Sequence, residues 1–286
     1  MKHIYNIAAG AFMSVGFSSG ISFGATSIIF AIFDRMVETL SFRKGKFKKN
    51  LPFLLTIILG GALATFLFSS LVDTLTEGYP VPTQFFFMGT IVGCFPIAKR
   101  FFKGVSLKSK STAIPFAVAA VAMIILSFLP ITEHDAITDV GVLTSVALYG
   151  ICVIGGVSTF IPSVSGSVII KLFGLSETVE YAKTHLAFDS GVRVILPVAL
   201  GYLTGFVLAA IIAFKLIKSC KNGFYSAVFG LMVGSLFVLF PVGFSFNFTG
   251  LYAFICLACG TIFSYYIGEM SRNEKQINDT KENDGE

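Results

Sequence analysis

The feature that most constrains the fold of this chain is a set of long segments without a charged side chain. Four segments of 21 or 22 residues contain no Asp, Glu, Lys or Arg, and a fifth contains none over 47 residues. About 20 apolar residues in a helix cross a bilayer, so the longest segment suffices for two crossings. The sequence therefore predicts six membrane-spanning helices, at 51–72, 80–98, 111–131, 193–214, 223–242 and 248–268.

The composition excludes a soluble protein. Hydrophobic residues make up 55% of the chain and charged residues 13%, about half the usual share of roughly 25% in soluble domains, and the mean hydropathy is +0.82. A membrane β-barrel would show alternating segments of about ten residues rather than solid apolar blocks. The N-terminal apolar stretch, 4–33, is also longer than the core of a cleavable signal peptide. The predicted class is an all-α polytopic membrane protein.

Two further apolar blocks, 4–33 and 140–170, are too long for one straight crossing and too short for two, and they predict helical hairpins at 4–33 and 140–175. Each is broken in the middle by glycine and serine, at 18–24 and at 162–167. A re-entrant helical hairpin fits this pattern, because its free backbone groups can be satisfied within the protein or by water. A single kinked spanning helix at each place is the alternative.

The charges in the loops favour re-entrance. Basic side chains gather at 43–49, 99–110 and 215–221, whereas 73–77 and 133–139 carry only acidic charges. Cytoplasmic loops are enriched in Lys and Arg, and the alternation closes only if both hairpins return to the side that they entered. We therefore expect both termini in the cytoplasm, the first hairpin entering from inside and the second from outside. The basic loops would also contact anionic lipids, and no nucleic acid is expected as a partner.

The two halves of the chain match when one is shifted by about 143 residues. The matching residues are Ser22 and Ser165, Phe30 and Phe173, and Asp34 and Glu177 at a shift of 143; Leu51-Pro52 and Leu196-Pro197, and Gly60 and Gly205 at 145; and Gly89 and Gly93 with Gly230 and Gly234 at 141. Three crossings per half invert the second half, as in many secondary transporters. The predicted organisation is an N-terminal repeat, 1–135, a C-terminal inverted repeat, 136–270, and a polar cytoplasmic tail, 271–286.

The interruptions of the two hairpins predict an anion site. The returning half of each hairpin would present its N-terminus, where unpaired N–H groups and the helix dipole favour a phosphate or carboxylate. Hydroxyl and glycine residues at these tips add donors and space: Ser18, Ser19, Gly20, Ser22, Thr26, Ser163, Ser165, Gly166 and Ser167. Small residues also allow close helix packing, which is the alternative explanation of these positions.

Charged residues close to the apolar blocks are few. Lys171 follows Ser165 by six residues, about 9 Å along a helix, and is expected below the lipid surface unless it snorkels. Arg35 and Arg193 are expected to anchor helices at the interface or to bind a phosphate bidentately. Four acidic residues are candidates for proton coupling or gating, or for helix capping: Asp34, Glu38, Glu177 and Glu180.

Two motifs suggest other chemistry only weakly. Residues 20–24 read G-x-S-x-G, the nucleophile pattern of serine hydrolases, which also require a base such as histidine near the serine. His134 and His185 are expected on the opposite side from Ser22, and the remaining histidine, His3, lies at the terminus. Cys256 and Cys259 have CxxC spacing without a second ligand pair, so we expect no metal and no cofactor.

At these residues the chain resembles the DUF368 membrane proteins, the polyprenyl-phosphate transporter family of bacteria and archaea. That family carries a PGVSGG-type element followed by Gly-Ile-Tyr-Glu/Asp-Arg, a Tyr-Pro-x-Pro segment, and a PG-x-SGS element. The corresponding segments here are 19–24, 31–35, 79–82 and 162–167. The resemblance covers about residues 5–270. Ser19, Phe23 and Ser163 depart from the family pattern.

The resemblance implies a transporter rather than an enzyme. Its expected activity is the return of undecaprenyl phosphate from the outer to the inner leaflet of the bacterial cytoplasmic membrane, for reuse in cell-wall and envelope glycan synthesis. Its partners would be the polyprenyl phosphate, membrane lipids and a coupling ion, a proton or sodium. A small-anion transporter, an intramembrane serine hydrolase and a non-transporting scaffold are the alternatives. We expect most of the 32 Phe residues to face lipid or pack the bundle.

Overall fold

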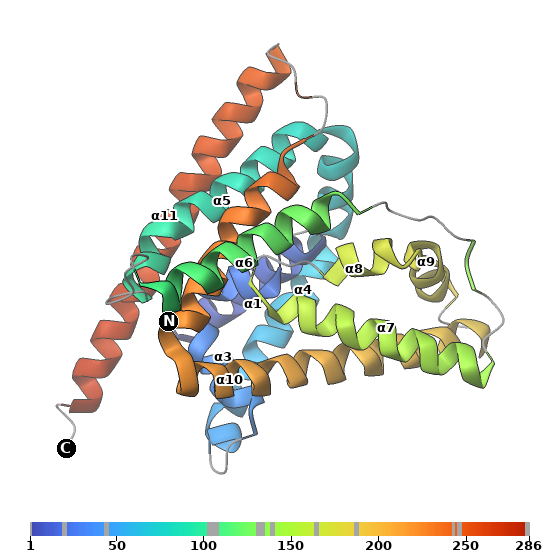
Figure 1. Ribbon diagram of the computed structural model, residues 1–286, viewed down its shortest axis with the longest axis horizontal. Coiled ribbons are helices and arrows are strands. Elements are labelled where there is room, and N and C mark those ends of the chain that lie inside the picture. The colour runs from blue at the N-terminus through green and yellow to red at the C-terminus, as the bar shows by residue number, and fades with distance from the viewer. Residues whose placement is uncertain are drawn as a thin grey trace.

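The computed structural model describes residues 2–18, 22–42, 46–101, 109–129, 135–137, 141–162, 166–185, 189–241, 244 and 248–283. This part of the chain consists of helices and their connections and contains no strand. The helices are α1 (Lys2–Ser18), α2 (Phe23–Ile29), α3 (Phe33–Leu40), α4 (Lys46–Gly78), α5 (Pro80–Phe101), α6 (Lys110–Ser127), α7 (Val142–Phe160), α8 (Gly166–Leu172), α9 (Ser176–Thr184), α10 (Asp189–Leu239) and α11 (Phe248–Asn283) (Figure 1). The all-helical class predicted from the sequence is confirmed.

Within the described residues, five helical stretches are long and apolar enough to cross a membrane. They are Phe47–Phe68, Lys110–Ser127, Val142–Phe160, Gly191–Leu239 and Gly250–Met270. The predicted span 80–98 lies in α5, which is outside this set. The set instead includes α7, the first arm of the second predicted hairpin.

Two of the predicted spans, 193–214 and 223–242, lie in the single element α10. Its backbone leaves helical geometry at Cys220, where φ is −143° and ψ is 64°. Figure 1 shows the ribbon turning sharply there, so α10 consists of two helices, 189–219 and 221–239. In the first half of the chain, the break between α4 and α5 falls at Tyr79, which is 141 residues earlier. The predicted tail is also partly helical, because α11 continues to Asn283.

The first helix of each predicted hairpin, α1 or α7, packs closely on a long helix. Added Cβ atoms on Gly10 of α1 and Gly60 of α4 would collide with the opposite backbone, and the hydroxyl oxygens of Ser14 and Thr65 lie 2.6 Å apart. The α7–α10 contact has the same character at Gly156 and Gly205, each of which faces a backbone carbonyl. Glycine at these positions lets the two backbones approach to van der Waals contact.

The remaining long helices pair across the two halves of the chain. Helix α5 packs on α11, where Gly89 and Gly260 each face a carbonyl of the partner helix, and α6 packs on the second part of α10 in the same way at Gly230. Ser226 donates a hydrogen bond of 2.6 Å to the Thr112 carbonyl across the α6–α10 pair. The two halves are therefore joined by backbone-close helix contacts rather than by a loose interface.

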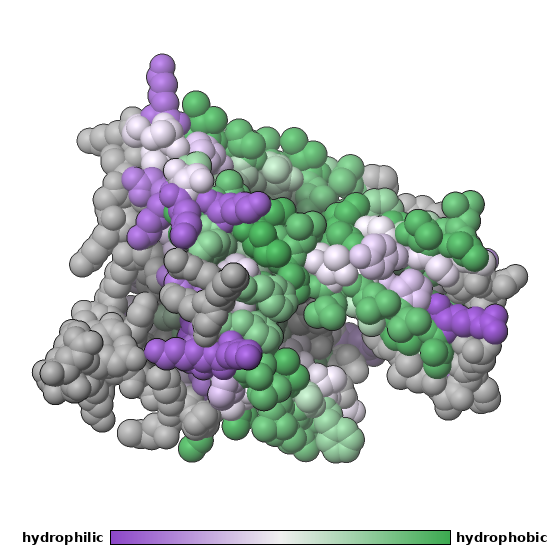
Figure 2. Space-filling model, turned by 90° about the horizontal axis from the view of Figure 1, so that it is seen from below, coloured by the Kyte–Doolittle hydropathy of each residue, from purple (hydrophilic) through white to green (hydrophobic). Residues whose placement is uncertain are grey.

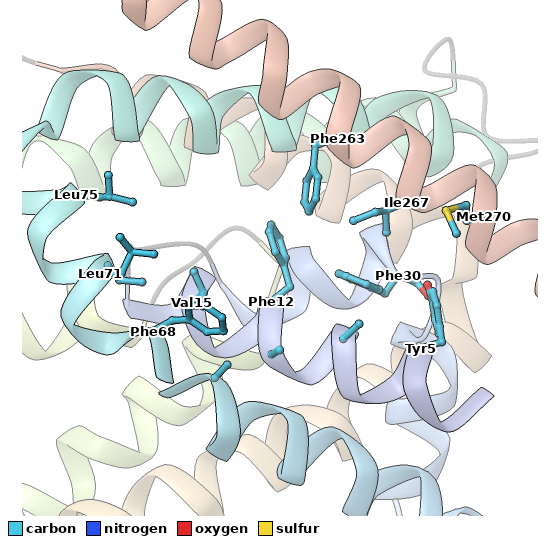
Figure 3. A pocket seen from close by; sticks show the side chains of 14 residues that line it. Tyr5, Phe12, Val15, Phe30, Phe68, Leu71, Leu75, Phe263, Ile267 and Met270 are labelled. Carbon is cyan, nitrogen blue, oxygen red and sulfur yellow. The ribbon is translucent and has the colours of Figure 1, made fainter. Parts of the chain in front are cut away.

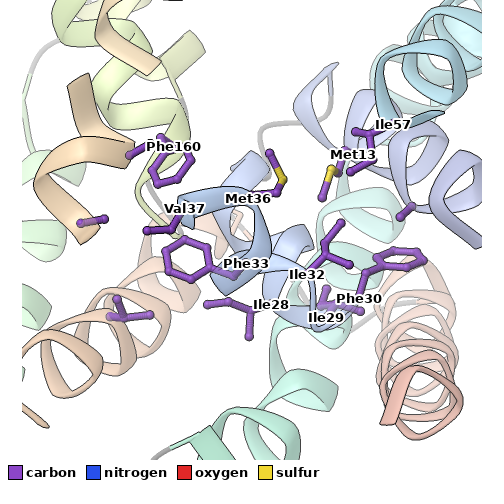
Figure 4. Close-up of a cluster of buried hydrophobic side chains, with 14 of the residues drawn as sticks. Met13, Ile28, Ile29, Phe30, Ile32, Phe33, Met36, Val37, Ile57 and Phe160 are labelled. Carbon is purple, nitrogen blue, oxygen red and sulfur yellow. The ribbon is translucent and has the colours of Figure 1, made fainter. Parts of the chain in front are cut away.

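The largest hydrophobic cluster surrounds α2 and α3. Figure 4 shows Ile29, Phe33 and Met36 pointing into it, with Met13 and Ile57 supplied by α1 and α4, and Phe160 supplied by α7. Most other large apolar side chains point outward, and Figure 2 shows broad hydrophobic areas between a few hydrophilic clusters. An outward apolar surface of this extent is stable in lipid and is unusual on a soluble monomer.

Candidate functional site

The interruptions of the two predicted hairpins meet inside the bundle. Gly24, in the first turn of α2, lies against the backbone that follows α7: a Cβ at Gly24 would be 2.6 Å from the nitrogen of Pro162 and would collide with the Phe160 carbonyl. Only a residue without a side chain permits this approach. The two predicted tips, which are separated by more than 130 residues in the chain, are thus in direct backbone contact.

Aromatic rings surround this contact. Phe206 of α10 packs edge-on against both Phe23 and Phe160, with ring centroids 5.1 and 5.0 Å apart. Phe33 of α3 also contacts Phe160, with 5.7 Å between the ring centroids. Pairs in these orientations contribute about 0.5–1.5 kcal/mol beyond the burial of their area. Phe23 replaces a glycine of the family pattern, and here its ring packs the junction.

Ser22 and Thr26 organise the start of α2. Ser22 is the N-cap: its hydroxyl accepts the Ala25 N–H at 3.1 Å, and its side chain is buried. The Thr26 hydroxyl donates to the carbonyls of Phe23, at 2.9 Å, and Ser22, at 3.2 Å, and is also buried. Both predicted ligand residues therefore stabilise the short helix in this conformation.

Both short helices end in the same turn. In the first, Ala31 has φ +50° and its N–H bonds the Ile28 carbonyl, while the next N–H bonds the Ser27 carbonyl. In the second, Gly174 has φ +66° and its N–H donates to the Lys171 carbonyl. The N–H of the next residue donates to the Ile170 carbonyl. This pair of bonds defines a Schellman motif, which needs a left-handed residue at this place. Ala31 and Gly174 are 143 residues apart, the shift that relates the two halves of the sequence.

Asp34 connects the first half of the chain to the second. Its carboxyl oxygen accepts a hydrogen bond of 2.7 Å from the hydroxyl of Tyr225, in the second part of α10. Tyr225 is buried, and Phe224 beside it stacks on Phe33. The charge of Asp34 next to an apolar block made it a candidate in the sequence, whereas nothing in the local sequence around Tyr225 indicates a partner 191 residues away.

Arg35 is held against α4. Its Nε donates to the Asn50 side-chain oxygen at 3.2 Å, and its guanidinium lies 4.1 Å from the ring centre of Phe53, a cation–π contact. Partial burial lowers the pKa of the guanidinium, which nevertheless stays protonated, as arginine does in proteins. Arg35 thus connects α3 to α4 through Asn50 and Phe53.

The second hairpin is more exposed. Gly166 begins α8 and is buried against α7, because a Cβ there would lie 2.6 Å from the Gly155 carbonyl and would collide with the Thr159 hydroxyl. Ser167 is half-buried in the first turn of α8. Lys171 is exposed in the last turn, and its ammonium has no hydrogen-bond or ion-pair partner among the described residues. It is therefore available to an anionic ligand.

The other predicted charged residues lie on the short helices that follow each hairpin and at the start of α10. Glu38 is half-buried on α3, and Glu177 and Glu180 are exposed on α9. Arg193 is exposed near the start of α10. The remaining predicted ligands, Ser19, Gly20, Ser163 and Ser165, lie outside the described residues, as does the side chain of Ser18.

The surroundings of Ser22 differ from those of a hydrolase nucleophile. The G-x-S-x-G motif functions at a sharp turn between a strand and a helix, whereas Ser22 follows the helix α1 and caps α2. His185, at the end of α9, stacks on Tyr181 with 4.2 Å between ring centroids. No group of three or more potential metal ligands exists among the described residues.

The fold and this junction define a polytopic, all-helical membrane protein in which two interrupted helix pairs meet within the bundle. Residues 15–250 match the VCA0040-like family, described as undecaprenyl phosphate translocase-like, and the chain belongs to this family. It is 27% identical over 205 residues to a polyprenyl-phosphate transporter of Staphylococcus aureus (strain NCTC 8325 / PS 47). That alignment covers 68% of this chain and 71% of the relative. No solved structure matches the chain. The family resemblance seen in the sequence is confirmed.

Proposed function

We propose that this protein transports undecaprenyl phosphate, a polyprenyl phosphate carrier, from the outer to the inner leaflet of the bacterial cytoplasmic membrane. The observation that carries this proposal is the contact of the two hairpins at Gly24 and Pro162. A phosphate headgroup would pass at this junction, while the prenyl chain remains in lipid. The names of the family and of the staphylococcal relative support the substrate class, and carrier recycling for envelope glycan synthesis follows from the direction.

The two halves would act as inverted repeats, 1–135 and 136–270, followed by the tail 271–286. Equivalent helix pairs support this organisation: α1 with α4 corresponds to α7 with α10, and α5 with α11 corresponds to the second part of α10 with α6. The equivalent glycines Gly60 and Gly205 lie at the close contacts of the α1–α4 pair and the α7–α10 pair. The Schellman turns at equivalent positions support it independently. Rocking of one half against the other would alternate access to the junction.

The direction of the helices supports re-entrance. In the α1–α4 pair, Gly10 lies against Ile57 and Ser14 against Thr65, so residue numbers rise together and the two helices run parallel. Two successive membrane crossings would run antiparallel. If α4 crosses the membrane, α2 and α3 must bring the chain back to the side from which α1 started. The α7–α10 pair has the same direction, because Tyr149 lies against Gly201 and Val153 against Gly205. Both termini would then be cytoplasmic.

The basic and acidic residues would have different roles in transport. Lys171 and Arg193, which are exposed, would attract the phosphate, together with Ser167 and the tip serines outside the described residues. Asp34 accepts a hydrogen bond from Tyr225 across the two halves, so a change in their packing would break or form this bond. Asp34 would thereby act in gating or proton coupling. Glu38, Glu177 and Glu180 are the further candidates for coupling to a proton or sodium gradient.

The proposal is tested by leaflet exchange of undecaprenyl phosphate in liposomes that contain the purified protein. The variants are Lys171→Ala, Lys171→Arg, which keeps the charge, and the double variant Ser22→Ala with Ser165→Ala; Lys215→Ala on α10 is the matched control. We expect Lys171→Ala to lower exchange about tenfold, since loss of a hydrogen bond to a charged group costs about 1.5–3 kcal/mol. Lys171→Arg and the control should retain exchange.

Three outcomes would overturn the proposal. No exchange by folded wild-type protein, with and without a pH gradient, would favour a small-anion carrier. Labelling of Ser22 by a serine-reactive probe would favour a hydrolase. If all of the tip variants exchange the lipid at the wild-type rate, the phosphate path does not run past the hairpins.

A further inference from the structure

An apolar pocket lies beside the first hairpin, between α1, α4 and α11. It has a volume of about 550 Å³. Figure 3 shows it as an elongated space, with Leu71 and Leu75 at one end and Tyr5 and Met270 at the other, and with the Phe12 and Phe263 rings between them. We name this pocket the α1–α4–α11 groove.

The lining of the groove has no polar group to offer to a ligand. Its fourteen side chains are Ala, Val, Leu, Ile, Met, Phe and a single Tyr. The Tyr5 hydroxyl donates a hydrogen bond of 2.9 Å to the Phe30 carbonyl, at the end of α2. A polar or charged occupant would lose its hydration without compensation, whereas a hydrocarbon chain gains from burial.

The groove is accessible from the surface that faces lipid. Phe68 and Leu71 on α4 are 45% and 52% exposed, and Met270 on α11 is 65% exposed. In a membrane-spanning bundle these side chains contact lipid chains. An occupant can therefore enter sideways from the bilayer without crossing an aqueous region.

The groove is continuous with the hairpin that carries the proposed phosphate site. Val15 lines it and lies one helical turn before Ser18, where α1 ends. At the opposite end of α2, Phe30 lines the groove and its carbonyl holds Tyr5. One wall of the groove is therefore formed by α1 and the end of α2, and a chain attached to a phosphate at the tip would extend along this wall.

We propose that the α1–α4–α11 groove binds the prenyl chain of the transported lipid during the passage of its headgroup. This inference rests on the proposed function. A 150 Å³ apolar cavity holds one benzene, so 550 Å³ accommodates about four five-carbon prenyl units. The groove would hold only the part of the chain nearest the phosphate, and the rest would stay in the bilayer.

The test introduces a bulky ring into the groove. Ala8→Trp and Ala11→Trp place an indole at lining positions on α1, of which Ala8 is exposed and Ala11 half-buried. Ala62→Trp is the matched control, because Ala62 is exposed on α4 and does not line the groove. Each protein is assayed in liposomes for exchange of undecaprenyl phosphate and for transport of isopentenyl phosphate. The single five-carbon chain of isopentenyl phosphate is too short to reach from the tip to Ala11, which lies about 10 Å along α1 from Ser18. Lipids retained by the purified proteins are measured by native mass spectrometry.

We expect both groove variants to lower the exchange and the retention of undecaprenyl phosphate by about tenfold, since each buried methylene group contributes about fourfold to an equilibrium constant. Isopentenyl phosphate transport should change less than twofold, and Ala62→Trp should behave as wild type. Equal losses for the long and short chains would overturn the inference, as would undecaprenyl phosphate exchange at the wild-type rate in both variants. Equal displacement of phosphatidylglycerol would identify a general lipid site instead. Absence of exchange by wild type would reject the proposed function itself, a result distinct from these.

Discussion

The two hairpins share a design but differ in how they are held. Each consists of an apolar arm, α1 or α7, an interruption, and a returning helix of seven residues, α2 or α8, that ends in a Schellman turn. In α2, every residue from Gly24 to Ile29 is buried, whereas in α8 only Gly166, Ile169 and Ile170 are. The same backbone motif is therefore placed at the centre of the bundle in one half and nearer its surface in the other.

The difference follows from the contacts of the two hairpins. The first hairpin and α3 contact helices of both halves: α1 packs on α4, Asp34 of α3 bonds α10, and Gly24 of α2 lies against the end of α7. The second packs mainly within its own half, in a separate small cluster formed by α7, α8, α9 and the first part of α10. We infer that the first hairpin is the fixed element of the junction and that the second is the one free to move.

Gly24→Ala should have the largest effect. The added methyl group meets the Phe160 carbonyl and the Pro162 nitrogen, so the backbones of the two hairpins must separate. We expect loss of most undecaprenyl phosphate exchange and a destabilisation of about 1–3 kcal/mol, measured by thermal unfolding in detergent. Gly150→Ala on α7 is the control, because a Cβ there meets nothing within 4 Å. Normal exchange by Gly24→Ala would show that the tips need not touch.

Tyr225→Phe should separate the first hairpin from the second half of the chain. It removes the hydroxyl that donates to Asp34, a bond to a carboxyl group that we expect to contribute about 1.5–3 kcal/mol if the carboxyl is charged. A double-mutant cycle with Asp34→Asn measures the coupling of the two side chains. Additive effects in that cycle would mean that this bond does not hold the first hairpin in place.

The two Schellman turns should respond with opposite signs. Gly174→Ala places a Cβ at φ +66° and should destabilise the protein by about 1 kcal/mol, whereas Ala31→Gly relieves an alanine at φ +50° and should stabilise it by up to about 1 kcal/mol. Thermal unfolding of both variants measures the two changes. If both substitutions shift the melting temperature in the same direction, the turns are not equivalent.

Tyr5→Phe should have the smallest effect. It removes only the hydrogen bond from α1 to the end of α2, which we expect to contribute about 0.5–1.5 kcal/mol. The ring remains against Phe30, so the packing is kept. Tyr252→Phe, at an exposed site on α11, is the control. A loss larger than that of Tyr225→Phe would show that the arms of the first hairpin are joined more strongly than the hairpin is joined to α10.

Several features of the site could be read from the chain because they are local. Glycine and serine runs interrupt the helical pattern, and the structure ends α1 at Ser18 and begins α8 at Gly166, both within the predicted interruptions. The two Schellman turns were not predicted, although Ala31 and Gly174 are separated by the same shift of 143 residues as the repeated positions. The role of Ser22 was less accessible, because a serine that caps a helix and a serine that binds a phosphate look alike in a sequence.

The membrane class and the helix breaks within the two hairpins follow from the amino-acid sequence, because hydrophobicity, charge and glycine content act within short stretches of chain. Which of these elements meet is seen only in the folded bundle. The contact of Gly24 with Pro162, the bond between Tyr225 and Asp34, and the α1–α4–α11 groove each join residues far apart in the chain. Such partners depend on how whole helices pack, and the surrounding residues carry no local signal of that packing.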